Sequence, residues 1–267
     1  MAQCDWNGDG AVDVVDIVQT VDCILNDCWA GEILGCTDPA ATNYNPNAIV
    51  DDCSCEYGFV CESTVADIDN NTYQTVQIGE QCWMVENLKV THYQNGDPIP
   101  TDYSDSEWAS LDDTETGAYA VYYDDPSNAV SYGNLYNWYA VDDARDICPE
   151  GWHVPTDLEW TELTDYLGGT TVAGGKMKST GAIENGDGLW YAPNTGATNE
   201  SGFTALPAGY RGIDAFYGGM GYYGRYWSSM ADGNGSAWGR GLVYTDSGVG
   251  RYSFSRRYGN SVRCTGD

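Results

Sequence analysis

Short runs of alternating apolar and polar residues, separated by Gly, Asn and Asp, fill the chain after residue 60. Tyr73–Ile78 alternates along its whole length, which predicts a half-buried strand. Further short strands are predicted at Ala118–Tyr123, Gly241–Tyr244 and Arg251–Phe254. The pattern indicates a sheet protein with a high content of loops.

One helix carries clear signals at both of its ends. Thr156 is a candidate N-cap, and Glu159 completes a capping box with it. Gly168 and Gly169 then provide the end signal. The apolar face of this helix is expected to contain three leucines, Leu158, Leu163 and Leu167. Together with the predicted strands, this helix gives the fold class α+β.

The chain is strongly acidic, because its 267 residues include 40 acids and 11 bases and carry a formal net charge of −29. Nucleic acid is excluded as a partner, because a phosphate backbone is bound by Lys and Arg. An anionic membrane surface is disfavoured for the same reason. No apolar run reaches the roughly 18 residues of a membrane helix, so no membrane span is expected.

The ten cysteines indicate disulfides and an oxidising compartment. A metal-thiolate site is poorly supported, because no pair of C-x-x-C motifs is present and His92 and His153 lie apart from any cysteine pair. Met1–Gln3 has neither the charged nor the apolar region of a signal peptide, so we expect a mature form whose export signal has been removed. The protein is therefore expected to be secreted.

Composition divides the chain into three predicted domains. The first 60 residues contain eleven acids, no Lys or Arg, and six of the ten cysteines. Within them, a loop–helix module is expected at 1–35 and a Cys-rich spacer module at 36–60. The remainder, 61–267, is expected to form one large domain.

A calcium-binding loop is the sharpest local signal. Oxygen ligands fall at the spacing that wraps about six to eight of them around one hard dication, and Gly10 occupies the tight turn. The expected ligands are Asp5, Asn7, Asp9, Ala11 (through its carbonyl), Asp13 and Asp16. An apolar helix pattern follows at once, and the last ligand is Asp instead of the Glu usual in EF-hands.

This loop and helix resemble one half of a type I dockerin. No second copy of the loop is present, so a structural calcium is expected rather than docking to a cohesin. The alternative is an acidic, Asx-rich turn that binds no metal.

Residues 36–55 resemble a short cysteine-closed spacer module of bacterial extracellular proteins. Such modules usually end in Asp-Asp-Gly-Ser-Cys, and here Cys53 replaces the Gly. Cys36–Cys55 is the preferred pair for closing the loop, although the sequence alone does not select among the pairings. An extra bridge from Cys53 to the first module is expected, with one of three partners: Cys4, Cys23 or Cys28.

The same segment contains four candidate ligands of a second cation, Asp38, Asn43, Asp51 and Asp52. Asx turns around Pro39 and Pro46 are an equally good interpretation of these residues.

Six strings in the large region occur together in a fixed order. They are DIDNNTY at 67–73, IGEQCWMVENLK at 78–89, YGNLYNW at 132–138, CPEGWHVPTD at 148–157, YWSS at 226–229 and SVRC at 261–264. These strings resemble the Fibrobacter succinogenes major paralogous domain over roughly 61–267. The resemblance implies an extracellular bacterial protein with a C-type-lectin-like fold. It also implies two disulfides, with Cys61–Cys82 closing the first hairpin and Cys148–Cys264 joining the helix region to the last strand.

Sugar binding through calcium is not signalled in the large domain. The Glu-Pro-Asn, Gln-Pro-Asp and Trp-Asn-Asp strings of C-type lectins are missing, and Ala192-Pro193-Asn194 lacks the acid. The many Tyr and Trp residues suit stacking on sugar rings, but an aromatic core accounts for most of them.

Catalysis is not expected either. The related formylglycine-generating enzymes work through active-site cysteines, whereas every cysteine of this large domain has a disulfide partner by the resemblance. His153 lies between Trp152 and Val154, a position typical of packing. No nucleophile with a base and no phosphate loop is found, so the protein is expected not to be an enzyme.

Positive charge is concentrated near the end of the chain, since the last 57 residues are net +3 and the first 60 are net −11. Opposite charges at the two ends favour head-to-tail contacts between copies, which form a filament when they do not close into a ring. The candidate assembly residues are Arg211, Arg225, Arg240, Arg251, Arg256 and Arg257. The alternative is that these arginines satisfy core and loop carbonyls within one chain.

The primary hypothesis is therefore a secreted, calcium-stabilised, non-enzymatic structural protein that self-assembles into an extracellular filament or surface layer. The alternative is a monomeric lectin-like adhesin on the bacterial surface that binds glycan or protein ligands. Three N-x-Ser/Thr strings provide candidate glycosylation sites at Asn70, Asn199 and Asn234.

Overall fold

A computed structural model describes residue 14, residues 33–55 and residues 61–267. Packing separates the chain into two compact units, residues 1–60 and residues 61–267. The expected boundary at residue 35 stays a prediction, because most of the residues before it lie outside the described part of the chain. None of the helices in the described part has the length and apolar character needed to cross a bilayer.

The described part of the first unit is a loop closed by a disulfide. Cys36 and Cys55 are bonded, and a parallel bridge joins Leu34 to Val50. Cys53 is also disulfide-bonded, but the three cysteines predicted as its partners lie outside the described residues. Four side chains accept a hydrogen bond from the backbone N–H two residues later, as Asx turns require; they are Asp38, Asn45, Asp51 and Asp52.

Two five-stranded sheets organise the second unit. The first sheet is antiparallel, in the order β1-β2-β3-β12-β6. Its strands are β1 (Thr64–Ala66), β2 (Thr72–Ile78), β3 (Gln81–Met84), β12 (Thr265–Gly266) and β6 (Trp152–His153). The strand predicted at Tyr73–Ile78 is thus confirmed as most of β2.

The second sheet has the order β11-β10-β9-β7-β8, and only the β7–β9 pair is parallel. Its strands are β7 (Ala208–Arg211), β8 (Tyr217–Met220), β9 (Tyr223–Ala231), β10 (Ser236–Val243) and β11 (Gly250–Ser255). A short ribbon pairs β4 (Tyr119–Ala120) with β5 (Leu135–Tyr136). The strand predicted at Arg251–Phe254 lies within β11, and the one predicted at Gly241–Tyr244 coincides with the end of the longer β10 except for Tyr244, which follows it.

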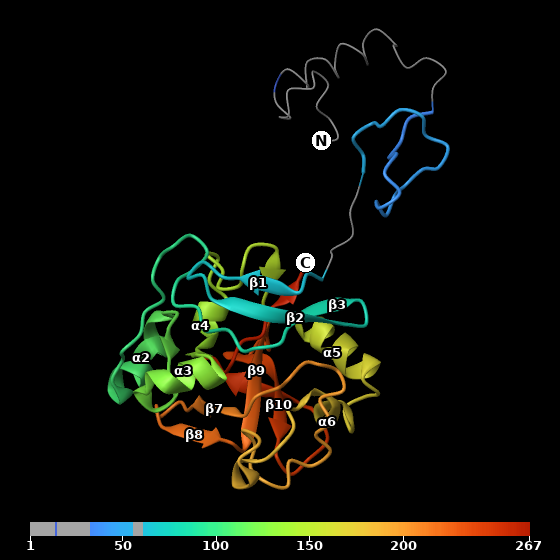
Figure 1. Cartoon of the computed structure of the whole chain (residues 1–267). Coiled ribbons are helices and arrows are strands. Elements are labelled where there is room, and N and C mark those ends of the chain that lie inside the picture. Colours follow the sequence, from blue (N-terminus) through green and yellow to red (C-terminus); the bar gives the residue numbers. More distant parts are fainter. Residues whose placement is uncertain (1–13, 15–32, 56–60) are drawn as a thin grey trace. The chain divides into compact units, whose positions relative to one another are not determined.

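The helices flank these sheets, with α2 and α3 on one side of the unit and α5 and α6 on the opposite side (Figure 1). They are α2 (Asp105–Thr114), α3 (Pro126–Tyr132), α4 (Trp138–Val141), α5 (Asp157–Tyr166) and α6 (Ala173–Met177). Short 3-10 turns lie at Tyr122–Asp124 and Ile183–Asn185. The fold is therefore mixed α and β, as expected.

Helix α5 has the predicted ends but a different apolar face. Thr156 and Glu159 form the capping box. Leu163 is fully buried, whereas Leu158 is 66% exposed, so the predicted face was wrong at that position. Trp160 is buried in its place. Two residues correspond to about 200° around a helix, so Leu158 points away from the side that buries Trp160.

The strand predicted at Ala118–Tyr123 is also wrong in its second half. Only Tyr119–Ala120 pairs with β5, and a 3-10 turn begins at Tyr122. Tyr123 has a φ of 55° and ψ of 21°, a left-handed conformation that no strand can contain. Apolar alternation alone does not reveal this turn.

A buried guanidinium joins the end of the chain to the rest of the domain. Arg263 has no exposed surface. Its guanidinium donates to the backbone carbonyls of Met84 and Phe203. It also donates to Oδ1 of Asn87, at 2.8 Å. It also stacks 4.4 Å from the Phe203 ring. Burial lowers the pKa of Arg263 to about 10. The charge is held by fixed oxygen dipoles instead of by a carboxylate.

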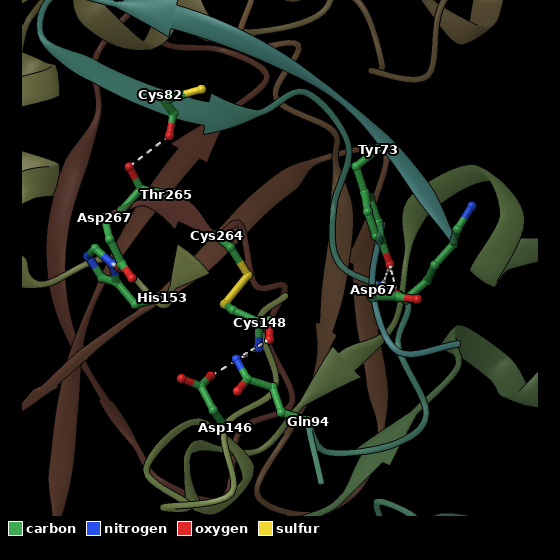
Figure 2. Close-up of a disulfide and its surroundings, with 11 residues drawn as sticks. Asp67, Tyr73, Cys82, Gln94, Asp146, Cys148, His153, Cys264, Thr265 and Asp267 are labelled. Atoms are coloured by element: carbon green, nitrogen blue, oxygen red, sulfur yellow. Dashed lines mark hydrogen bonds and ion pairs between the residues drawn. A yellow bond between two sulfur atoms is a disulfide. The ribbon is translucent and has the colours of Figure 1, made fainter. Parts of the chain in front are cut away.

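The two disulfides implied for the large domain are present. Cys61–Cys82 spans 21 residues and Cys148–Cys264 spans 116. Figure 2 shows that Cys148–Cys264 lies beside β12, where the Thr265 hydroxyl donates to the Cys82 carbonyl. The second bridge therefore ties the last strand to the segment before α5.

Removing Cys148–Cys264 is predicted to cost more stability than removing Cys61–Cys82. A Cys148→Ala/Cys264→Ala variant should lose about 3 to 5 kcal/mol of unfolding free energy. The matched Cys61→Ala/Cys82→Ala variant should lose about 1.5 kcal/mol less, because its loop is shorter and leaves the unfolded chain less restricted. Urea unfolding of both variants measures the difference, and equal losses would contradict the loop-closure explanation.

Candidate functional site

Two of the six arginines proposed for assembly are interior residues. Arg211 is 2% exposed, lies 4.4 Å from the Trp108 ring and donates to the Tyr103 carbonyl at 2.9 Å. Arg240 is 4% exposed and pairs with Asp157 at 2.7 Å. These side chains stabilise the domain from inside, so they cannot contribute to a free positive surface.

Three further arginines of this set also make contacts within the chain. Arg251 pairs with Asp157 and lies 3.3 Å from the Trp238 ring. Arg256 lies 4.5 Å from the Trp138 ring, and Arg257 donates to the Ala109 carbonyl. The alternative interpretation, in which the arginines serve one chain, describes these residues better than the charge-driven contact between copies.

The sixth arginine, Arg225 of β9, lies at the centre of a cluster of aromatic rings. Its guanidinium is 3.7 Å from the ring centre of Tyr210, 5.2 Å from that of Phe254 and 5.5 Å from that of Tyr223. Tyr258 lies 5.6 Å away. These contacts are cation–π interactions, which strengthen where water is partly excluded.

Strand register places these rings on one face of the second sheet. Arg225 pairs with Gly241, and Gly241 pairs with Gly250. Because side chains alternate along a strand, Tyr252 and Phe254 share the face of Gly250, and therefore that of Arg225. We call this surface, formed by Tyr210, Tyr223, Arg225, Tyr252, Phe254 and Tyr258, the aromatic face.

Glycines beneath Tyr252 let its ring lie close against the sheet. A Cβ added at Gly241 would lie 2.8 Å from the ring, and one added at Gly250 would lie 2.4 Å from it. A Cβ added at Gly239 would lie 3.0 Å from the Phe254 ring. Tyr252 is nevertheless 46% exposed. The arrangement presents a ring with a broad accessible surface on a rigid support.

Two pockets adjoin Tyr252, and both are also lined by Gly241 and Val243. One pocket, of about 180 Å³, contains Arg225 together with Tyr223 and Phe254. The other, of about 270 Å³, is lined by three side chains that can hydrogen-bond, Thr170, Thr171 and Asp246. The exposed ring is thus flanked by a cationic group on one side and by hydroxyl and carboxylate groups on the other.

A buried lysine positions the loop that carries Asp246. Lys178 has no exposed surface, and its Nζ donates to the backbone carbonyls of Asp246 at 2.8 Å, Thr195 at 2.9 Å and Val243 at 3.1 Å. Burial lowers the pKa of Lys178 to about 8. Three carbonyls around one ammonium fix the end of β10, and with it the pocket wall.

A larger pocket, of about 460 Å³, lies at the start of α3, away from the second sheet's aromatic face. Its wall includes Lys89, Asp102, Tyr119, Asp124 and Val130. It offers one aromatic ring, and Asp124 already accepts a hydrogen bond from Tyr217. The aromatic face is the stronger candidate for a ligand that stacks, because several rings surround its cation, whereas this pocket offers one ring beside Lys89.

The predicted calcium ligands Asp5, Asn7, Asp9, Ala11, Asp13 and Asp16 lie outside the described residues. In the described part, no group of three or more His, Cys, Asp or Glu side chains is placed to hold a metal ion.

Among the three candidate glycosylation sites, Asn70 and Asn234 are exposed, whereas the Asn199 amide is occupied by two hydrogen bonds with Thr204.

His153 is held between two carboxylates. Its Nε2 is 2.8 Å from Oε1 of Glu159, and its Nδ1 is hydrogen-bonded to Asp267 (Figure 2). The hydrogen bond with Glu159, helped by Asp267, raises the pKa of His153 to about 9. Burial alone would raise the pKa of Glu159, but hydrogen bonds from His153 and Thr156 lower it to about 2. A histidine protonated at neutral pH is a structural cation and a poor general base.

The second unit is thus a disulfide-stabilised α and β domain with a half-buried aromatic cluster on one sheet, from which the Tyr252 ring is exposed. The family model described as the Fibrobacter succinogenes major domain matches residues 76–265, and the chain belongs to this family, which is bacterial. This match confirms the family expected from the sequence strings. No curated protein and no solved structure matches the chain.

Sequence reasoning missed the aromatic face. The sequence does contain a signal for it. Glycines occupy alternate positions of β10, at Gly239 and Gly241, and aromatic residues occupy alternate positions of β11, at Tyr252 and Phe254. It becomes informative only when the register of the two strands is known.

Stability should fall between pH 6.5 and 9 as His153 loses its proton. Because the pKa of His153 is higher in the folded state, its contribution is complete below the unfolded value of 6.5 and is lost as the pH rises through about 9. We expect a loss of about 1 kcal/mol, since the group is partly screened by solvent. Urea midpoints across this range should decline in the native protein and stay flatter in His153→Gln. A parallel decline in both would contradict the assignment.

Proposed function

We propose that the protein is a secreted, non-enzymatic bacterial surface protein whose second unit binds carbohydrate through the aromatic face. The observation that carries this proposal is the exposed Tyr252 ring, supported by Gly241 and Gly250 and flanked by two pockets. Sequence reasoning placed this function second to self-assembly. We place it first here, because the internal contacts of the arginines and the geometry of Tyr252 support it.

Sugar rings suit this surface for a physical reason. A pyranose has an apolar C–H face that packs on an aromatic ring and a rim of hydroxyls that needs hydrogen bonds. Beside Tyr252, Arg225 supplies donors, while Asp246 and the hydroxyls of Thr170 and Thr171 supply acceptors. These groups bind a sugar without a bridging calcium ion.

Other features support secretion and the absence of catalysis. Three disulfides lie within the described residues, and such bonds persist in oxidising compartments. No cysteine of the described part is free, so the cysteine chemistry of the formylglycine-generating enzymes has no candidate there. The mixed α and β fold with a disulfide to the last strand also supports the proposed C-type-lectin-like relationship.

Replacing Tyr252 with Ala is predicted to weaken binding to any glycan that the native protein binds in an array. The loss should be at least about 10-fold, or about 1.4 kcal/mol, because the stacking surface is removed. Gly241→Ala should weaken binding as well, since the new methyl group displaces the ring that it supports.

Calorimetric titration measures these effects. Tyr166→Ala is the matched control, because Tyr166 is a 67% exposed tyrosine of α5 outside the aromatic face. Unchanged affinity in Tyr252→Ala, or an equal loss in the Tyr166 control, would exclude the aromatic face as the binding site.

Self-assembly into a filament or surface layer is the second candidate function. The observation that favours it is strand β11, which lies at the edge of the second sheet and has only β10 as a neighbour. An open edge presents unpaired N–H and C=O groups to another chain. Calcium bound by the dockerin-like loop at 5–16 would stabilise the first unit in either function, because a ligand bound only to the folded state raises stability.

Removal of calcium is predicted to lower the melting temperature of the full chain. Addition of a chelator should abolish the calcium-dependent part of the transition seen by differential scanning calorimetry. An Asp9→Asn/Asp16→Asn variant should melt alike in calcium and in chelator. Electron microscopy of the same samples tests assembly, which predicts filaments in calcium; dispersed particles in both conditions would reject the second candidate.

A further inference from the structure

Three arginines of the second unit contact aromatic rings without an ion pair among the described residues, namely Arg225, Arg256 and Arg263. Of these three, Arg225 lines the pocket beside Tyr252. Ion pairs with carboxylates hold Arg145, Arg211, Arg240, Arg251 and Arg257. Buried Arg263 has four carbonyl and amide acceptors within reach. Among the described residues, no carboxylate lies within ion-pair distance of Arg225, and its hydrogen-bonding partner is the Tyr258 hydroxyl.

The surroundings of Arg225 leave its charge poorly compensated. Burial lowers the pKa of Arg225, which means that the aromatic rings remove water without supplying a negative charge. Arg225 lines the pocket of about 180 Å³ itself, so the N–H donors that Tyr258 does not use face a ligand bound there. The pocket that it lines contains no acidic residue.

The geometry points to an acidic sugar as the ligand, with its carboxylate or sulfate group bound by Arg225 while its ring packs on Tyr252. This inference rests on the proposed function and adds the ligand's charge to it. A guanidinium binds a carboxylate or sulfate through two parallel hydrogen bonds, and such charge-assisted bonds are about twice as strong as neutral ones. Both residues line the same pocket of about 180 Å³, so one sugar unit can contact them together.

The negative charge of the whole chain does not prevent this. Charges further apart than about 8 Å are screened at physiological salt, so the local environment of the pocket decides. Asp246 lines the other pocket and does not line the one that contains Arg225. The net charge of −29 should instead slow the approach of polyanions and make binding stronger as salt is added up to moderate levels.

Glucuronic acid and glucose form a matched pair of probes, because they differ only in the oxidation of one carbon, and glucose 6-sulfate tests the sulfate alternative. Each probe should be titrated against the full chain and used to compete with whichever glycan the array identifies. We expect at least one acidic probe to bind at least about 10-fold more tightly than glucose, the gain typical of a charge-assisted bidentate contact. This comparison uses the native protein, so it does not depend on how a variant folds.

The variants Arg225→Gln and Arg225→Lys then test the residue. Gln should remove the preference for the acidic probe, and Lys should retain part of it, because Lys keeps the charge but loses the planar pair of donors. Arg145→Gln is the control, since Arg145 pairs with Asp143 and Asp97 outside the aromatic face.

The outcomes separate the two proposals. Equal affinity for glucose and both acidic probes, with binding still lost in Tyr252→Ala, would overturn the acidic ligand and leave carbohydrate binding intact. A preference that survives in Arg225→Gln would overturn the role of Arg225. Absence of binding to every glycan in the array and to all three probes would overturn the proposed function itself.

Discussion

The fold depends on burying one positive charge without a negative partner. Arg263 precedes the last strand and reaches acceptors on two segments, Met84 and Asn87 at and just after the end of β3, and Phe203 before β7. A guanidinium without water costs several kcal/mol unless its donors are satisfied, so these carbonyls must be held in fixed positions. Both segments are therefore constrained by the same group, and the chain leads directly from Arg263 into β12, which lies between β3 and β6 in the first sheet.

Lys178 applies the same principle on the other side of the domain. Its ammonium binds the carbonyl of Val243 at the end of β10 and those of Thr195 and Asp246, which lie outside the helices and strands. A bound cation often organises such loops in small extracellular domains, and here a side chain performs that function. The consequence reaches the aromatic face, because Val243 and Asp246 line the pockets beside Tyr252.

The arginines of this acidic chain serve mainly in internal packing. Most guanidiniums stack on rings or pair with carboxylates inside the domain, so they stabilise packing instead of creating a basic surface. Arg225 and Arg256 are stacked in the same way without an ion pair among the described residues, and Arg225 also lines the pocket beside Tyr252. This combination is the basis of the ligand proposed for Arg225.

The sequence by itself determined what depends on neighbours along the chain. Thr156 and Glu159 define the start of α5, alternation defines β2, and the strings from Asp67 to Cys264 define the family and, through it, both disulfides of the large domain. The calcium loop remains a prediction of that kind. Only the tertiary structure decided that Leu158 is exposed, that Tyr123 ends a strand, and that Tyr252 lies over Gly241 beside Arg225. The physical reason is that helix caps and alternation are local, whereas the register between β9, β10 and β11 is set by packing among residues far apart in the chain.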